Sequence, residues 1–185
     1  RKTPIDWKGY TPPKPGFTGV RALRSYDLAT LARYIDWTPF FASWELTGRY
    51  PQILDDKIVG EPARALFADA QAMLKKIVDE KQLTAHGVVG FWPANSDGDD
   101  IVLYTDETRG KELARFHGLR QQIAKRETGA PNYCLSDFVA PKETGLADYV
   151  GAFAVTAGVG EEALADSFDA RADNYSAIMS KALAD

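Results

Sequence analysis

The chain has 185 residues, of which 45% are apolar and 26% are charged, as in a typical soluble globular domain. Its 22 Lys and Arg residues against 26 Asp and Glu residues give a net charge of −4, which argues against a general nucleic-acid binder and a polybasic membrane anchor. The single cysteine, Cys134, excludes an internal disulfide and a cysteine-rich zinc site. No apolar run is long enough to span a membrane, and no signal core follows the N-terminal charges, so we expect a cytoplasmic protein.

Proline and glycine are dense in residues 1–20, which we therefore expect to form an extended arm or linker before a folded body over 21–185. Residues 19–26 have strand character, and Asp27 can cap a short helix that follows it. Thr38 followed by Pro39 is typical of an N-cap and a first helical residue. We expect helices near 27–47, 60–82 and 160–185; the last has no stop signal, which predicts that it continues past Asp185.

Short β-rich runs separate these helices. Residues 88–93 and 101–104 predict a hairpin with a turn of about five residues over 95–99, and 113–116 is a further strand candidate. Residues 132–139 and 148–156 also have strand character, and the second run lacks alternation, which is typical of a strand covered on both faces. The expected fold class is α/β in the mixed, α+β sense, with a mostly antiparallel, twisted sheet flanked by helices.

The sharpest candidate for ligand binding is Asp36, which adjoins an aromatic cluster: Trp37, Phe40, Phe41 and Trp44. A carboxylate in a partly apolar pocket formed by these rings could accept charge-assisted hydrogen bonds from the hydroxyls or ammonium of a ligand. The alternative is that Asp36 only caps the following helix through the amides near Pro39 and Phe40.

Other scarce residue types give weaker signals. His86 and His117 have no nearby cysteine or histidine partner, so we expect no metal site and no catalytic residue. Three aspartates surround Gly98, but Tyr104 stands where an EF-hand requires Glu, so an acidic turn is favoured over calcium binding. No phosphate-binding glycine motif occurs. The basic cluster Arg120–Arg126 is either a solvated edge or a docking site for an acidic partner.

Several longer segments, in order along the chain, resemble one family. They are Arg33-Tyr34-Ile35-Asp36-Trp37-Thr38-Pro39-Phe40-Phe41, Leu119-Arg120-Gln121-Gln122, Asn132-Tyr133-Cys134-Leu135-Ser136-Asp137-Phe138-Val139-Ala140-Pro141, Asp148-Tyr149-Val150-Gly151-Ala152-Phe153-Ala154-Val155-Thr156 and Ile178-Met179-Ser180-Lys181-Ala182-Leu183-Ala184-Asp185. These segments are similar to the C-terminal reactivation domain of cobalamin-dependent methionine synthase, which binds S-adenosylmethionine (AdoMet). The resemblance identifies residues 21–185 as the N-terminal portion of this domain.

The resemblance implies a repair reaction within a methyltransferase. Such a domain delivers the methyl group of AdoMet to an inactive cob(II)alamin while a flavodoxin-type partner supplies an electron. Cobalamin is bound by another module of the same enzyme, which is therefore a partner. By its place in the Asp-Trp-Thr-Pro-Phe-Phe motif, Asp36 is implied to contact AdoMet.

The resemblance also has a gap. The family's later segment with Arg and Gly-Tyr-Pro, which carries most remaining ligand contacts, has no counterpart in Arg1–Asp185, and no Asp-x-His-x-x-Gly cobalamin motif occurs. We therefore expect one wall of the AdoMet site, with little activity in the isolated chain. Two alternatives stay open: a non-catalytic docking module for the cobalamin domain or flavodoxin, through Arg49 or the Arg120–Arg126 region, and a free-standing enzyme on a truncated scaffold.

Overall fold

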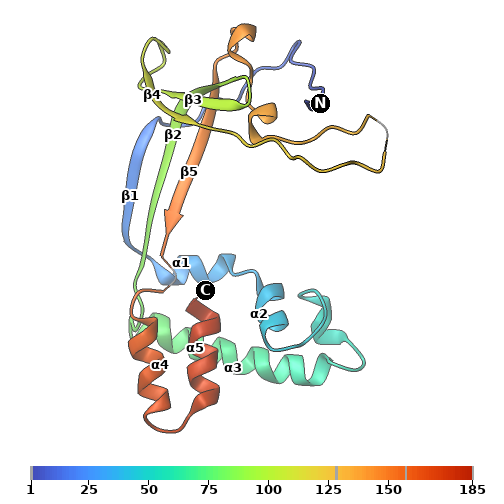
Figure 1. The fold of residues 1–185 in the computed structure, drawn as a ribbon. Coiled ribbons are helices and arrows are strands. Elements are labelled where there is room, and N and C mark those ends of the chain that lie inside the picture. The colour runs from blue at the N-terminus through green and yellow to red at the C-terminus, as the bar shows by residue number, and fades with distance from the viewer. Residues whose placement is uncertain (1, 128, 157, 185) are drawn as a thin grey trace. The chain divides into compact units, whose positions relative to one another are not determined.

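The computed structural model describes residues 2–127, 129–156 and 158–184 (Figure 1). It forms two compact units: unit 1 comprises Arg1–Arg21 and Val88–Ala154, and unit 2 comprises Ala22–Gly87 and Val155–Asp185. The strands are β1 (Gly19–Tyr26), β2 (Ala85–Asp97), β3 (Asp100–Tyr104), β4 (Glu112–Phe116) and β5 (Asp148–Val155). The helices are α1 (Leu28–Leu31), α2 (Trp37–Ser43), α3 (Gly60–Asp79), α4 (Glu161–Asp169) and α5 (Asn174–Ala184).

The strands form one sheet in which β2 is the central element. The order β1-β2-β3-β4 follows the sequence, and β5 also pairs with β2. The β2–β3 and β3–β4 pairs are antiparallel. The predicted fold class, a mixed fold with a mostly antiparallel sheet and flanking helices, is confirmed.

The β2–β3 hairpin is tighter than the sequence suggested. Asp97 and Asp100 are register partners, so the turn contains two residues rather than about five. Gly98, the first of them, has a φ of 65°, a conformation that glycine adopts without a steric cost. The polar residues before Gly98 belong to the strand because two of them, Asn95 and Ser96, are buried and hydrogen-bonded.

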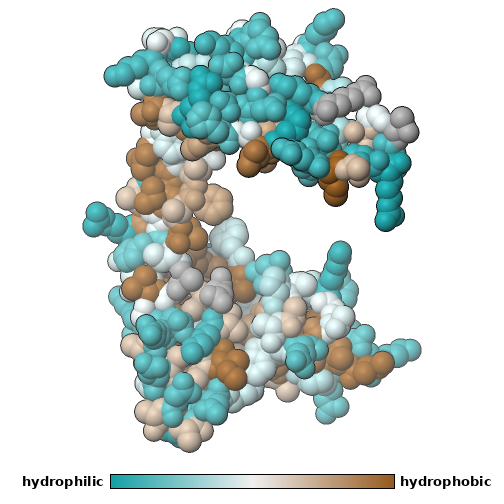
Figure 2. All heavy atoms as spheres, in the orientation of Figure 1, coloured by the Kyte–Doolittle hydropathy of each residue, from teal (hydrophilic) through white to brown (hydrophobic). Residues whose placement is uncertain are grey.

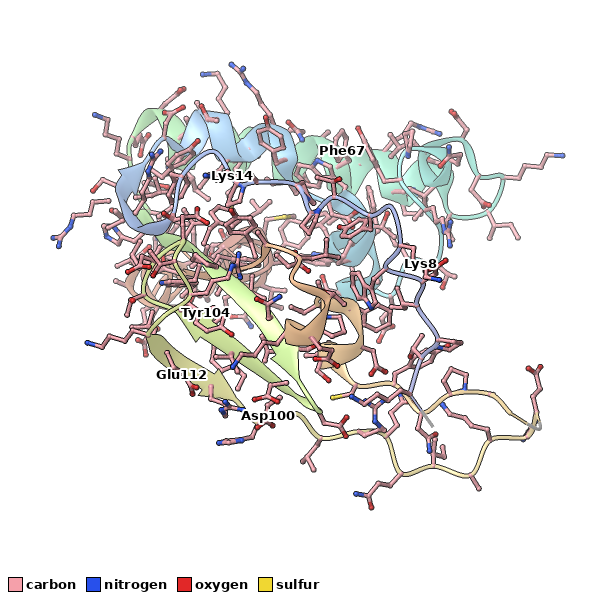
Figure 3. The ribbon with its side chains drawn as sticks, turned by 90° about the horizontal axis from the view of Figure 1, so that it is seen from above. Lys8, Lys14, Phe67, Asp100, Tyr104 and Glu112 are labelled. Atoms are coloured by element: carbon pink, nitrogen blue, oxygen red, sulfur yellow. The ribbon has the colours of Figure 1, made fainter. Side chains whose placement is uncertain are left out.

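These two polar side chains hold a loop against the core of unit 1. Asn95 Nδ2 donates to the carbonyl oxygens of Ala140 and Leu146 at 3.0 and 2.9 Å, and Ser96 Oγ donates to that of Val139 at 2.8 Å. Apolar side chains of β2, β3 and the loop form a small core: Ala94, Ile101, Leu103 and Val139. Figure 2 shows a mainly hydrophilic surface over the β3–β4 hairpin. Figure 3 shows the register partners Tyr104 and Glu112 on these two strands.

The strand predicted over 132–139 is wrong. A 3-10 turn occupies Leu135–Phe138 instead. Asp137 causes the difference, because its carboxylate accepts a hydrogen bond from the Cys134 amide at 3.2 Å and closes the turn locally. Such side-chain bonds to nearby amides compete with strand pairing. Cys134 is buried, as expected for a small apolar side chain.

The prediction that the 148–156 strand is covered on both faces is also wrong for this chain. A strand is present as β5, but Gly151–Val155 are exposed, and Phe153 is 79% exposed. The lack of alternation therefore identifies the strand without identifying what covers it. Residues 4–18, before β1, contain no helix or strand, and the boundary expected at residue 20 stays a prediction.

Unit 2 is built around α3 and a cluster of aromatic rings. Pro62 lies in the first turn of α3, as predicted, and the buried face of the helix includes Ala63, Leu66 and Ala70. These residues pack with Trp37, Phe40 and Phe41 of α2 and with Met179 of α5 in one core. Figure 3 shows Phe67, which projects from α3; its ring meets that of Trp37 edge-on, 4.8 Å between centroids.

Residues 27–47 contain the two short helices α1 and α2, and the predicted cap at Asp27 is confirmed, whereas the single helix predicted over 160–185 is divided into α4 and α5. Helix α4 ends at Asp169 in a Schellman motif: the Asp173 amide donates to Phe168 O at 3.0 Å, and the Ala172 amide donates to Asp169 O at 2.9 Å. Ala172 has the left-handed φ of 59° that glycine usually supplies, so no glycine marks this helix end. Asp173 then accepts a bond from the Ser176 amide before α5. Asp185, the predicted point of continuation, lies outside the described residues.

Candidate functional site

The carboxylate of Asp36 lies at the start of α2, in unit 2. Asp36 is the N-cap: its Oδ1 accepts a hydrogen bond from the Thr38 amide at 3.0 Å. The prediction that Thr38 is the cap and Pro39 the first helical residue is therefore wrong by two positions. Because Pro39 stands at the third helical position and has no N–H, the Thr38 amide is the one usual capping donor left to Asp36.

The capping bond uses only one of the two carboxylate oxygens. Within the described part of the chain, Asp36 Oδ2 has no hydrogen-bond or ion-pair partner, and the residue is exposed. Capping and ligand binding, which the sequence analysis treated as alternatives for Asp36, are therefore compatible. Oδ1 holds the helix while Oδ2 is presented to solvent.

The aromatic neighbours of Asp36 do not form a pocket around its carboxylate. Trp37, Phe40 and Phe41 are buried in the core of unit 2. The partly apolar pocket predicted at Asp36 is therefore wrong for this chain. The rings fix the backbone of α2 from inside the core, and the carboxylate lies on its exposed side.

A loop returns from the end of α2 to its first turn. The Tyr50 amide donates to Thr38 Oγ1 at 3.2 Å. The Tyr50 ring stacks on that of Phe41, 6.3 Å between centroids and 17° between planes, and lies 5.4 Å from that of Phe67. Arg49, a candidate docking residue, is exposed on this loop.

Unit 2 also contains an apolar cavity of about 420 Å³. Its wall includes Leu31, Ile35, Ile77 and Leu183, but not Asp36. His86 lines the same cavity, and its Nδ1 accepts a hydrogen bond from the Ser25 amide at 3.0 Å. This bond requires a neutral imidazole with its proton on Nε2. The cavity and the Asp36 carboxylate are therefore separate features of unit 2.

In unit 1, the Arg120 guanidinium is enclosed by carboxylates. It donates to both oxygens of Asp137 at 2.7 Å and to both oxygens of Asp99 at 2.7 and 3.2 Å. The side chains of Arg120 and Asp137 are 15% and 1% exposed. These bonds to Arg120 hold the pKa of the Asp137 carboxyl well below its usual range. The donors of Arg120 are therefore used within the unit. Lys125 is half-buried and donates to Gln121 Oε1 at 2.8 Å, whereas Arg126 is exposed, so the docking role of the Arg120–Arg126 region stays a prediction.

The aspartates around Gly98 bind basic side chains of the chain itself. Arg115 pairs with Asp97 at 3.1 Å, and His117 Nδ1 lies 3.0 Å from Asp100. Among residues 2–127, 129–156 and 158–184, no group of three or more His, Cys, Asp or Glu side chains is arranged to hold a metal ion. No helix of these residues has the length and apolar character needed to cross a membrane.

Sequence reasoning missed two polar residues that organise these units. Asp137 was included in a strand, although it collects bonds from Arg120, Thr3 and Cys134. Tyr175 donates through its hydroxyl to Asp69 Oδ2 at 2.9 Å, and burial together with this bond raises its pKa to about 12. Apart from Cys134, which is three residues from Asp137, these partners are distant in sequence, so no local pattern predicts the bonds to them.

A family model described as the vitamin B12-dependent methionine synthase activation domain matches residues 27–185. The chain belongs to this family. A solved structure described as the MetH reactivation domain bound to AdoHcy is 54% identical to the chain, with a TM-score of 0.89. The match covers 99% of this chain and 55% of that neighbour, so the chain spans about half the neighbour's length. The family inferred from the Asp-Trp-Thr-Pro-Phe-Phe and related segments is confirmed.

Proposed function

We propose that the chain contributes one wall of an AdoMet site that serves reactivation of cobalamin in a methionine synthase. The observation that supports this proposal is the 54% identity to a reactivation domain bound to AdoHcy, the product that remains when AdoMet gives up its methyl group. The chain covers 55% of that domain, so the rest of the site would come from residues beyond those present here.

In this proposal, Asp36 binds and orients the methyl donor. Its Oδ1 stays on the Thr38 amide while Oδ2 accepts a hydrogen bond from the ligand. AdoMet offers an ammonium group and ribose hydroxyls as donors, and its sulfonium adds a second positive charge. A hydrogen bond to a charged group contributes about 1.5–3 kcal/mol once water is excluded. The exposed carboxylate would reach this range only when ligand and the rest of the domain cover it.

Methyl transfer itself needs no proton from Asp36. Bound cobalamin, once reduced by one electron from a flavodoxin-type donor, would supply the nucleophile that bonds to the methyl group, while the sulfonium sulfur would keep the C–S electron pair and leave as AdoHcy. Cobalamin would be held by another module, since this chain has no Asp-x-His-x-x-Gly motif. The part played by this chain is to place the donor.

Titration calorimetry tests this role on a chain extended to the length of the AdoHcy-bound neighbour. Asp36→Ala should weaken AdoMet binding about ten-fold or more, because a charged hydrogen bond is lost. Asp27→Ala is the matched control, since Asp27 also caps a short helix, through Thr30, outside the proposed site. An unchanged affinity in the Asp36→Ala variant would refute the assignment of Asp36.

AdoHcy titrations refine the contact. AdoHcy keeps the ammonium and the hydroxyls but lacks the sulfonium charge. If Asp36 binds the shared groups, Asp36→Ala should weaken both ligands by similar factors. A loss confined to AdoMet would place the carboxylate beside the sulfonium instead.

The second candidate, a docking module for the cobalamin domain or flavodoxin, is supported by an exposed cation on each unit: Arg49 and Arg126. Docking through these residues should weaken with salt, because exposed charges are screened. Arg49→Glu should then reduce binding of flavodoxin more than binding of AdoMet. Salt-independent flavodoxin binding would contradict this candidate.

A further inference from the structure

Building on the proposed ligand contact of Asp36, we propose that Thr38 is a positioning residue whose side-chain hydroxyl fixes that carboxylate. Two hydrogen bonds meet at Thr38. Its amide donates to Asp36 Oδ1 at 3.0 Å, and its Oγ1 accepts from the Tyr50 amide at 3.2 Å. The backbone N–H of Thr38 therefore binds the Asp36 carboxylate, while its side chain is held by the Tyr50 amide.

Asp36 has no alternative capping donor in the first turn. An N-cap carboxylate normally uses the amide of the second or third helical residue. Here the third residue is Pro39, which has no N–H. Any displacement of Thr38 is therefore passed directly to Oδ1 of Asp36, and so to the direction in which Oδ2 points.

Tyr50, whose amide donates to the Thr38 hydroxyl, is itself held by aromatic packing. Its ring packs on those of Phe41 and Phe67, and Phe41 is completely buried. Only seven residues form α2, too few for a helix to be stable by itself. The first turn of α2 thus depends on tertiary contacts, and the bond from Tyr50 connects it to the aromatic core.

The hydroxyl also determines where the return loop ends. Residues 44–49 leave the end of α2, and the Leu46 amide donates to Phe41 O at 3.0 Å. The loop closes where the Tyr50 amide reaches Thr38. The exposed carboxylate of Asp36 and the loop that carries Arg49 therefore share Thr38 as a common anchor.

A double-mutant cycle tests whether Thr38 acts through Asp36. Thr38→Val keeps the shape and the backbone amide but removes the acceptor for Tyr50; Thr38→Ser keeps the hydroxyl. In the chain extended to the neighbour's length, Thr38→Val should weaken AdoHcy binding about five-fold, as expected for one lost neutral hydrogen bond. Thr38→Ser should remain within about two-fold of the parent chain. In the Asp36→Ala background, Thr38→Val should cause no further loss.

The outcomes separate this inference from the proposed function. If Asp36→Ala weakens AdoHcy binding but Thr38→Val does not, the proposed function stands and the role of Thr38 is refuted. The role is also refuted if Thr38→Val is equally harmful with and without Asp36, or if Thr38→Ser is as impaired as Thr38→Val. If Asp36→Ala has no effect, the proposed function fails, and the inference fails with it.

Amide hydrogen exchange on the 185-residue chain gives a readout that needs no ligand. In the Thr38→Val variant, the amides of Tyr50 and Thr38 should exchange at least about ten-fold faster. The variant lacks the acceptor for the Tyr50 amide, so local opening of the first turn of α2 costs less free energy. Core amides of α3 should keep their protection, which also shows that the variant is folded. Unchanged exchange at both amides would overturn the proposed link.

Discussion

The two units of this chain are stabilised in opposite ways. Unit 1 binds its loops to the sheet with buried or half-buried polar groups, such as the Arg120–Asp137 pair and the side chains of Asn95 and Ser96. Unit 2 packs its short helices around aromatic rings, with Phe41 completely buried. The difference shows how a chain can order irregular segments without a large core: most of its buried polar groups have to find partners.

Arg109 follows the same rule in unit 1. Its guanidinium donates to the carbonyl oxygens of Ala94 and Asp148 and to Asn95 Oδ1, at 2.8–3.0 Å. In unit 2, the corresponding task of holding the loop after α2 falls mainly to the ring of Tyr50. A polar network specifies geometry through the directions of its bonds, whereas an aromatic core does so through shape.

The largest expected effect breaks the aromatic core. Phe41→Ala should lower the free energy of unfolding by about 4 kcal/mol, since it leaves a cavity among rings that cannot collapse fully. Phe153→Ala is the control, because this side chain of β5 is 79% exposed, and it should change stability by less than about 0.5 kcal/mol. Urea denaturation measures both. Equal losses would contradict the assignment of the core.

A slightly smaller effect is expected from breaking the polar network. Asp137→Asn should lower the free energy of unfolding by about 3 kcal/mol, because it leaves the Arg120 guanidinium incompletely paired in a largely buried site. Asp79→Asn removes an exposed ion pair with Lys75 and should cost less than about 0.5 kcal/mol. If both substitutions lower the free energy of unfolding equally, the Arg120–Asp137 pair does not stabilise unit 1 in the way described.

The same network predicts an acid dependence. The pKa of Asp137 is lowered chiefly by Arg120, so the folded state binds a proton less readily than the unfolded state. Its contribution is present above the unfolded pKa of about 4 and is lost as the pH falls toward the folded value. The stability difference between the parent chain and Asp137→Asn should therefore shrink below about pH 4. If the stability difference between the parent chain and Asp137→Asn stayed constant with pH, the lowered pKa of Asp137 would not be its cause.

The smallest effect concerns alkaline pH in unit 2. Burial and Asp69 raise the pKa of Tyr175 to about 12, above an unfolded value of about 10, so the folded state holds this proton more tightly. The stabilisation is present below the unfolded pKa and is lost as the pH rises toward 12. Tyr175→Phe should reduce the fall in stability between about pH 10 and 12. Denaturant midpoints across this range measure it, with Tyr34→Phe, an exposed tyrosine, as the control.

Much of the fold could be predicted from periodicity, and the exceptions share a physical cause. β1, β4 and α3 follow patterns of strand and helix character that are visible in short windows of sequence. The break at Ala172 was missed because alanine adopts a left-handed conformation that sequence rules assign to glycine. The turn at Leu135–Phe138 was missed because hydrophobic periodicity does not reveal the local bond from the Cys134 amide to Asp137, and Arg120, which also binds Asp137, lies 17 residues away.

At the candidate site, too, some features could be predicted from the sequence and others could not. Resemblance to a family singled out Asp36, but neither the pattern nor the resemblance showed that its aromatic neighbours face the core and leave the carboxylate exposed. Placing Thr38 as the cap was wrong because the Thr-Pro pair is not the signal that starts this helix. The Asp36 carboxylate accepts a hydrogen bond from the Thr38 amide, so the helix begins two residues earlier.

The most direct measurement is a crystal structure of the chain, extended to the length of its AdoHcy-bound neighbour, in complex with AdoMet. The account predicts that Asp36 Oδ2 lies within hydrogen-bond distance of the ligand's ammonium or ribose hydroxyls while Oδ1 remains on the Thr38 amide. A complex in which no ligand atom reaches the Asp36 carboxylate would contradict it.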